Sequence, residues 1–204
     1  MGDPSKRVVV CGGAMRSERP TDAELSRGCR QDDPRAWRAL VRAYSPLVYG
    51  LALRMLGSVP EAEDVCQEVF MKIHRAFSSY DATRPLAPWV SRIAYNECLH
   101  RVRGAMVRAT RATDPSELPP VVAPSGTSPE AQVAQGELET LLTRASADLS
   151  AQDRALLTLR YAGGLSDSEV AEAVGMPINT VKTRISRAKA LLKERLTAAG
   201  VGEP

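Results

Sequence analysis

Aromatic residues, histidines and long apolar runs are scarce in this chain of 204 residues. Aromatic residues make up 4% of it, and there are only two histidines. Because strands favour aromatic and β-branched residues, whereas Ala, Leu and Arg favour helices, the composition predicts an all-α protein. So few histidines support no Ser/His/Asp or Cys/His arrangement, and no glycine-rich phosphate loop follows a predicted strand. The sequence therefore does not favour enzymatic chemistry of these kinds.

The four cysteines form no CxxC pair, and no secretory signal or membrane-length apolar run is found. We therefore expect a cytoplasmic protein with reduced thiols. Cys66 and Cys98 are expected as small buried apolar residues. Residues 1–20 are predicted to be a disordered N-terminal extension, in which Met15 offers an alternative start.

Charge is unevenly distributed along the chain. Residues 1–111 carry 18 Lys and Arg against 12 Asp and Glu, residues 112–172 carry 3 against 10, and residues 173–204 carry 6 against 2. The net charges are therefore +6, −7 and +4. Basic regions of this kind attract phosphates, although arginines scattered over solvated helix faces give the same count.

A segment rich in Pro, Ser and Thr divides the chain. Residues 111–131 lack helical periodicity and are predicted to be a flexible linker. Two small helical domains result, at residues 21–110 and 132–198. In the first, we expect a helix from Pro34 that Pro46 interrupts, a second over 47–56, a third from Pro60, and a loop over 78–88 before a fourth helix over 89–106. The core candidates of that fourth helix are Trp89, Ile93, Leu99 and Val102.

The stretch "AEDVCQEVFMKIHRAF", residues 62–77, has the period of an amphipathic helix. Its apolar side must be buried, whereas its acidic side faces water or a partner. Spacing alone does not say whether these acids form a reaction centre, a metal site or a docking face. The apolar positions are Ala62, Val65, Cys66, Val69, Phe70, Ile73 and Phe77, and the polar positions are Glu61, Asp64, Glu68 and Lys72.

The second domain has the spacing of a helix-turn-helix. Ser150 with Asp153, and Ser166 with Glu169, match helix-capping patterns. A helix-turn-helix needs a small residue where its two helices touch, a glycine in the turn and an apolar residue that anchors the second helix. Ala171, Gly175 and Val181 have this spacing, which would present the last helix to the DNA major groove. An ordinary helical hairpin with a solvated basic face is the alternative. The predicted buried stripe is Val181, Ile185, Ala188, Leu192 and Leu196, and the predicted exposed, DNA-binding residues are Thr180, Lys182, Thr183, Arg184, Arg187 and Lys189.

A metal site is a weaker interpretation. Glu97 and His100 form one Glu-x-x-His pair, whereas a di-iron bundle needs two such pairs and further glutamates. The only other histidine is His74. No metal or other cofactor is therefore predicted.

Taken together, these segments resemble an extracytoplasmic-function (ECF) sigma factor of the bacterial sigma-70 family. "AEDVCQEVFMKIHRAF", then "PLAPWVSRIAYNECLHRVR", a Pro-rich linker and "LSAQDRALLTLRYAGGLSDSEVAEAVGMPINTVKTRISRAKALLKERL" follow the family's order and spacing from about Asp22 to Leu196. The chain departs from the common pattern at Tyr95, where arginine is frequent, and at "CLHRVR", where an acid often precedes the arginines.

The resemblance implies a promoter-recognition subunit without catalytic activity. It implies that Asp64, Gln67 and Glu68 dock on the clamp helices of core RNA polymerase. The second domain would read the minus-thirty-five element, and an anti-sigma factor, often membrane-bound, would hold the protein inactive. The implied minus-ten contacts are the loop 78–88, Asn96, Arg101 and Arg103.

Two rival functions stay open on the sequence alone. One is a helix-turn-helix DNA-binding regulator of another kind, such as a response regulator with a similar C-terminal domain. A response regulator would need an α/β receiver domain, and residues 21–108 show no strand alternation. A helical metalloenzyme is the other rival.

Overall fold

The computed structural model describes residues 20–111 and 145–198, except residue 147. All regular structure in these ranges is helical, so the all-α prediction is confirmed. The predicted linker lies almost wholly outside the described residues. Its first residue, Arg111, is the last residue of a helix.

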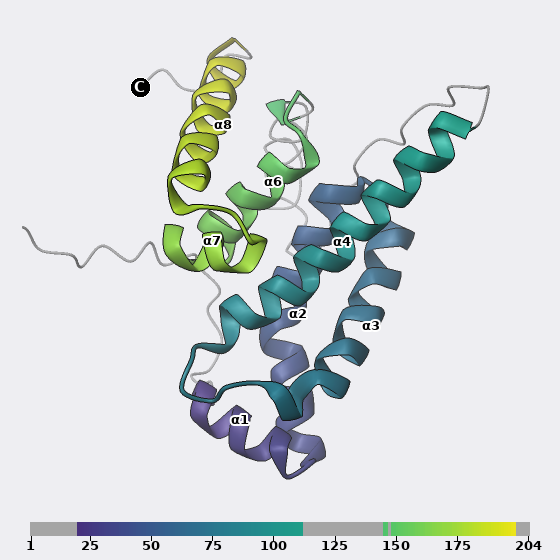
Figure 1. Cartoon of the computed structure of the whole chain (residues 1–204), viewed down its shortest axis with the longest axis vertical. Coiled ribbons are helices and arrows are strands. Elements are labelled where there is room, and N and C mark those ends of the chain that lie inside the picture. Colours follow the sequence, from purple (N-terminus) through teal and green to yellow (C-terminus); the bar gives the residue numbers. More distant parts are fainter. Residues whose placement is uncertain (1–19, 112–144, 147, 199–204) are drawn as a thin grey trace, which may run out of the picture.

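The first domain consists of α1 (Asp22–Arg30), α2 (Pro34–Leu56), α3 (Val59–Ala76), the 3₁₀ turn η1 (Phe77–Ser79) and α4 (Leu86–Arg111). Helix α2 packs against α1, α3 and α4, and α4 crosses the domain diagonally, with its C-terminal end projecting beyond the other helices (Figure 1). Large aliphatic side chains from every helix meet between them. Leu25, Leu40, Val65 and Val90 are examples, and burying each contributes about 1.5–3 kcal/mol.

Pro46 does not interrupt the helix that contains it, so the prediction of two helices over 34–56 is wrong. Helix α2 is continuous from Pro34 to Gly57, its left-handed C-cap. Proline removes one backbone hydrogen bond and crowds the preceding turn. The buried residues Leu40 and Val48, on either side of Pro46, anchor both halves of α2 in one core, which outweighs that cost.

Helix α4 begins at Leu86, three residues before the predicted start. Its first amide is capped from a distance: the Leu86 N–H donates to Asp22 Oδ2 at 2.9 Å. The predicted core residues of α4 are only partly buried. The fully buried face of α4 lies to one side of these residues, around the helix axis, and contains Val90, Ala94, Tyr95 and Cys98.

The second domain consists of α6 (Ala151–Leu157), the π-helical turn η2 (Thr158–Ala162), α7 (Asp167–Val174) and α8 (Ile178–Ala198). The predicted caps are confirmed, because Ser150 and Ser166 accept hydrogen bonds from the amides of Asp153 and Glu169. Gly175 ends α7 with φ +68, a left-handed conformation that favours glycine. The turn between α7 and α8 is therefore set by local chemistry.

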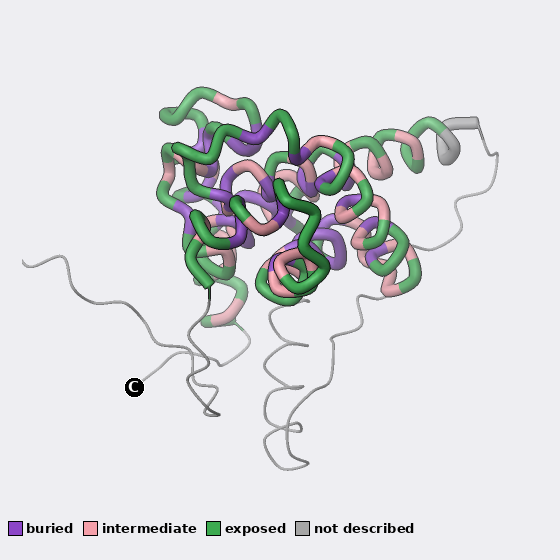
Figure 2. The backbone as a smooth tube through the Cα atoms, turned by 90° about the horizontal axis from the view of Figure 1, so that it is seen from below, coloured by how far each residue is buried: buried purple, intermediate pink, exposed green. Residues whose placement is uncertain are grey.

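The two domains share one apolar core. Helix α7 packs on α4, and α6 and η2 pack on α2 (Figure 1). The buried residues lie inside the packed helices of both domains, with exposed residues around them (Figure 2). At Gly163 the approach is close: a methyl group there would lie 2.7 Å from the Leu159 carbonyl oxygen and 3.1 Å from Leu47 Cδ1 of α2. This position therefore requires glycine.

Candidate polymerase and nucleic-acid interfaces

The polar face of α3 is open to solvent. Ser58 caps the helix by accepting a hydrogen bond from the Glu61 amide, and the acid in the first turn suits the helix dipole. On the opposite side of α3, Ala62, Val65, Val69 and Ile73 are fully buried. Asp64 and Gln67 are exposed, and Asp64 has no ion-pair partner among the described residues. An unpaired carboxylate on a rigid helix is available to a basic partner.

Further along α3 the charges are paired. Glu68 is half-exposed, with one carboxylate oxygen 3.9 Å from Lys72 Nζ. Lys72 also forms a close ion pair with Glu97 of α4. Lys72 lies on the predicted polar side of α3, and its ammonium group links α3 to α4.

Glu97 is the buried member of a charge cluster whose two cations are partly exposed. Its side chain is 5% exposed, and it accepts hydrogen bonds from Lys72 and, at 3.3 Å, from Arg101 Nε. Burial raises the pKa of Glu97, but the bonds and charges of Lys72 and Arg101 outweigh burial and hold that pKa below its ordinary value. The Glu97 carboxylate is therefore occupied by cations of the protein. Among the described residues, no group of His, Cys, Asp and Glu is arranged to hold a metal ion.

The predicted DNA-contacting residues of α4 lie in different environments. Asn96 and Arg103 are exposed. Arg101 is partly exposed, with its guanidinium bound to Glu97. Tyr95, where the chain departs from the common family pattern, is fully buried. Only Asn96 and Arg103 are therefore free to reach a ligand without rearrangement.

The loop before α4 is held in place from both ends. Arg30 Nη2 donates to the Tyr80 carbonyl at 2.6 Å, and the Tyr80 hydroxyl donates to the Arg84 carbonyl. The Tyr80 ring packs in tilted contacts between Phe77 and Trp89, whose ring centroids lie 5.6 and 4.9 Å away. These contacts brace the loop against α1 and α4. No local pattern predicts the roles of Asp22 and Arg30, because they lie 64 and 50 residues from their partners.

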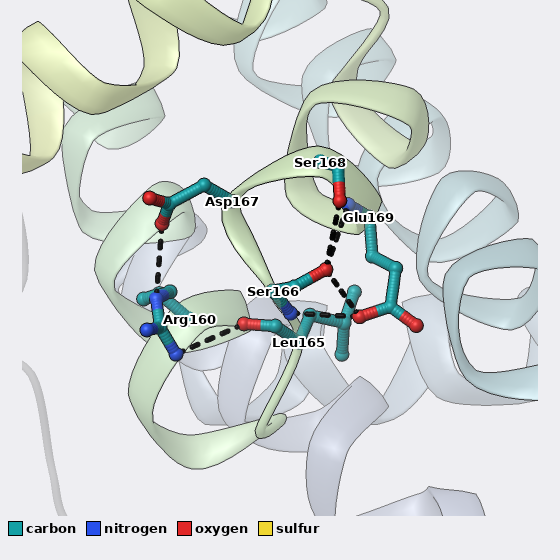
Figure 3. A network of polar contacts seen from close by, with 6 residues as sticks. All are labelled: Arg160, Leu165, Ser166, Asp167, Ser168 and Glu169. Carbon is teal, nitrogen blue, oxygen red and sulfur yellow. Dashed lines mark hydrogen bonds and ion pairs between the residues drawn. The ribbon is translucent and has the colours of Figure 1, made fainter. Parts of the chain in front are cut away.

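Helix α7 is fixed at its N-terminus by polar contacts (Figure 3). The Ser166 amide donates to Glu169 Oε2 at 2.7 Å, and the Glu169 amide returns a bond to Ser166 Oγ, which completes a capping box. Arg160 of η2 holds Asp167 at 3.0 Å and the Leu165 carbonyl at 3.2 Å. The helix that precedes the turn is thus tied to the chain before it.

Helix α8 presents a basic face. Its buried stripe is Val181, Ile185 and Ala188, with Leu192 and Leu196 partly buried, so the predicted stripe is confirmed. The exposed residues on the outer face include Thr180, Lys182, Thr183, Arg187 and Lys189.

Arg184 is the exception, and its predicted exposure is wrong. Its side chain is 27% exposed and turns toward α6, where Nε lies 2.7 Å from Asp153 Oδ1 and Nη1 lies 3.0 Å from Gln152 Oε1. Burial raises the pKa of Asp153, but the hydrogen bonds from Arg184 and Ser150 hold it below its ordinary value. Arg184 lies at the border between the buried and exposed faces of α8, so its side chain can turn either way. The ion pair with Asp153 of α6 favours the inward direction.

The fold and the basic helix-turn-helix define a class of transcription-initiation proteins. Residues 40–108 match the model of Sigma-70 region 2, and residues 139–192 match the model of Sigma-70, region 4. Within the described ranges, no helix is both long and apolar enough to cross a membrane.

Known relatives specify the type. The chain is 31% identical to the ECF RNA polymerase sigma factor SigW of Bacillus subtilis over 172 residues, which cover 82% of this chain and 92% of that one. It is 30% identical to the ECF RNA polymerase sigma-E factor of Escherichia coli K12 over 191 residues, 88% of this chain and 96% of that one. The protein belongs to the ECF sigma factors of the sigma-70 family, which direct RNA polymerase to promoters and are not enzymes themselves.

A solved structure shares the fold. It is a co-crystal structure of the sigma factor RpoE in complex with the anti-sigma factor NepR from Bartonella quintana, with a TM-score of 0.66 and 24% sequence identity over 78% of this chain and 96% of that one. Family membership decides against the response-regulator and metalloenzyme interpretations.

Proposed function

We propose that the two domains of this sigma factor divide its work. The polar face of α3 docks on core RNA polymerase, the loop and outer face of α4 engage the minus-ten element, and the outer face of α8 engages the minus-thirty-five element. The cytoplasm, where RNA polymerase transcribes the chromosome, is the proposed compartment. The observation that carries the docking proposal is the exposed carboxylate of Asp64 on a helix whose other side is fully buried.

The docking role rests on charge. Asp64 and Glu68 lie one helical turn apart on α3, and together with Gln67 they offer acceptors on one surface. Acids at the surface of an interface steer and orient a basic partner. Neither carboxylate is buried, so their substitution should leave the core of the domain intact.

A double charge reversal tests this role. Asp64→Arg combined with Glu68→Arg should weaken binding to core polymerase about tenfold or more, because two attractive contacts become repulsive. Binding is measured by titrating labelled sigma factor with core enzyme, and helical content by circular dichroism. Glu194→Arg, at an exposed site on α8 of the second domain, is the matched control. Undiminished affinity in the double variant would place the docking surface elsewhere.

The DNA-reading role rests on the outer face of α8. Lysine and arginine side chains there can hold phosphates, and the planar guanidinium of Arg187 can bind a guanine edge through two hydrogen bonds. Run-off transcription from a promoter library, with core polymerase and with or without this chain, tests the role as a whole. Selection of promoters that share two spaced elements is expected. Transcripts that do not depend on the added chain would contradict it.

We also propose inhibition by an anti-sigma factor. The Bartonella quintana structure holds a sigma factor in such a complex, and this chain shares its fold. An inhibitor purified on the immobilised chain should block transcription and compete with core polymerase for α3. Equal binding of that inhibitor to free and polymerase-bound sigma factor would contradict competition.

A further inference from the structure

Two cations of the first domain share one buried carboxylate. Glu97 Oε2 accepts a hydrogen bond from Lys72 of α3, and Glu97 Oε1 accepts one from Arg101 of its own helix, α4. The Glu97 side chain is 5% exposed, whereas the side chains of Lys72 and Arg101 are 43% and 33% exposed. Packing therefore fixes the acid in place and leaves both cations partly accessible to solvent.

The two cations are held unequally. Lys72 makes the closer contact with Glu97, whereas the bond from Arg101 Nε is 3.3 Å long, beyond the usual range of about 2.7–3.2 Å. Lys72 has a second acid nearby, because Glu68 Oε1 lies 3.9 Å from its Nζ, but this pair is exposed and contributes little. Of the two partners of Glu97, Arg101 is therefore the one more easily released.

One cation is enough to satisfy the buried acid. A carboxylate that is buried without a partner is costly, because it loses its hydration and gains no interaction in return. With Lys72 in place, Glu97 keeps a hydrogen-bonded cation when Arg101 turns away. Without Lys72, the same movement would leave Glu97 buried and unpaired. The cost of releasing Arg101 thus depends on a residue of the neighbouring helix.

We propose that Lys72 is a positioning residue for promoter binding: it neutralises Glu97 and so frees the Arg101 guanidinium to contact a promoter phosphate. Arginine suits this role, because its charge is permanent and its guanidinium binds carboxylate and phosphate oxygens alike. Arg101 belongs to the same helix as Asn96 and Arg103, whose exposed side chains are part of the proposed minus-ten surface. The inference rests on that proposed role of α4.

The salt dependence of promoter binding by the holoenzyme tests this role. Each phosphate contact adds roughly 0.7–0.9 to the slope of log affinity against log salt concentration, so Arg101→Gln should lower the slope by about this amount. Lys72→Gln should lower it as much, because Arg101 then stays bound to Glu97. Lys72→Arg, which keeps a cation beside Glu97, should restore the parent slope. Arg38→Gln, which removes an exposed cation of α2, is the matched control and should not change the slope.

A second substitution separates this competition from damage to the fold. Adding Glu97→Gln to Lys72→Gln removes the negative charge that holds Arg101, so the slope should return to the parent value. General damage would not be repaired in this way, because the double variant has lost both members of the Lys72–Glu97 ion pair. Circular dichroism and urea titration establish that each variant is folded under the conditions of the binding assay.

Nuclear magnetic resonance on the free protein reports on the Arg101 side chain directly. Its Nε–H signal is identified as the one that Arg101→Gln removes. In Lys72→Gln, exchange of this proton with water should be roughly two- to tenfold slower than in the parent, because Arg101 is then the one cation left to Glu97. In the double variant with Glu97→Gln, exchange should be faster than in the parent. Equal exchange in all these proteins would overturn the competition.

The binding assay has three results that would overturn the proposal. An unchanged slope in Arg101→Gln would show that Arg101 makes no phosphate contact. A parent slope in Lys72→Gln would remove the positioning role of Lys72. A lowered slope that Glu97→Gln does not restore would assign the loss to the fold. Transcription by the unaltered chain in the run-off assay tests sigma function independently of all three.

Discussion

In both α4 and α8, one arginine side chain turns inward to an acid and a second arginine side chain stays exposed. Each has two arginines that the sequence predicts to contact DNA. In each helix one of them turns inward to an acid, Arg101 to Glu97 and Arg184 to Asp153. The other two, Arg103 and Arg187, are exposed and have no ion-pair partner among the described residues.

The ion pairs Arg101–Glu97 and Arg184–Asp153 differ in how deeply their carboxylates are buried. Glu97 is 5% exposed and is shared by cations from α3 and α4, whereas Asp153 is 22% exposed and pairs with one arginine. A buried carboxylate with two cationic partners fixes the spacing of two helices. The shallower pair of the second domain orients α8 on α6. Both pairs position a helix, and the exposed arginine beside each is left to act on a ligand.

Glu97→Ala should have the largest effect. It removes a buried carboxylate that accepts hydrogen bonds from two cations, and hydrogen bonds to charged groups contribute about 1.5–3 kcal/mol each. Because Lys72 and Arg101 can turn to solvent, we expect a net loss of about 2–3 kcal/mol in the free energy of unfolding. Urea titration measures it. Glu63→Ala, an exposed acid of α3, should change it by less than about 0.5 kcal/mol, and equal losses would refute a structural role for the cluster.

Acid should weaken the same cluster. The pKa of Glu97 is lower in the folded state than its ordinary value of 4.5, so the unfolded state binds more protons as the pH falls below that value. The stabilisation by Glu97 is complete above its unfolded pKa and is lost as the pH falls through its folded pKa. Urea titrations from pH 7 downward should show a steeper loss in the parent than in Glu97→Gln. Parallel curves would contradict this assignment.

Arg184→Ala and Arg187→Ala should distinguish an arginine that stabilises the fold from one that recognises DNA. Loss of the Arg184 ion pair should lower the free energy of unfolding by about 1–2 kcal/mol and weaken transcription from all promoters alike. Arg187→Ala should leave stability unchanged and cost about 1–3 kcal/mol of discrimination at one base of the minus-thirty-five element. Thermal unfolding and competition among promoter variants measure the two effects. A stability loss in both variants would remove the distinction.

Arg103→Ala should have the smallest effect. The side chain is exposed on α4, and the loss of one phosphate contact weakens all sequences uniformly and lowers the salt dependence of binding by about one unit. Stability should not change. Salt titration of promoter binding by the holoenzyme measures the slope, with Arg38→Ala on α2 as an exposed control. An unchanged slope would exclude Arg103 from the DNA interface.

The sequence by itself determined the features that depend on neighbouring residues. The caps at Ser150 and Ser166, the left-handed turn at Gly175 and the buried stripe of α8 all follow from interactions over three or four positions. The family resemblance rests on the same local patterns. Such features are predictable because both partners of each interaction lie in one short stretch of chain.

Only the tertiary structure decided where the charged side chains went. Pro46 stays inside α2 because the core on either side of it outweighs one lost hydrogen bond. Asp22 caps α4 from 64 residues away, Asp153 turns Arg184 inward, and Glu172 meets Arg84 across the domains. A long, flexible side chain at the border of a helix face can turn either way at little cost. Its direction is chosen by the opposite charge that helix packing brings beside it, and no local pattern records that neighbour.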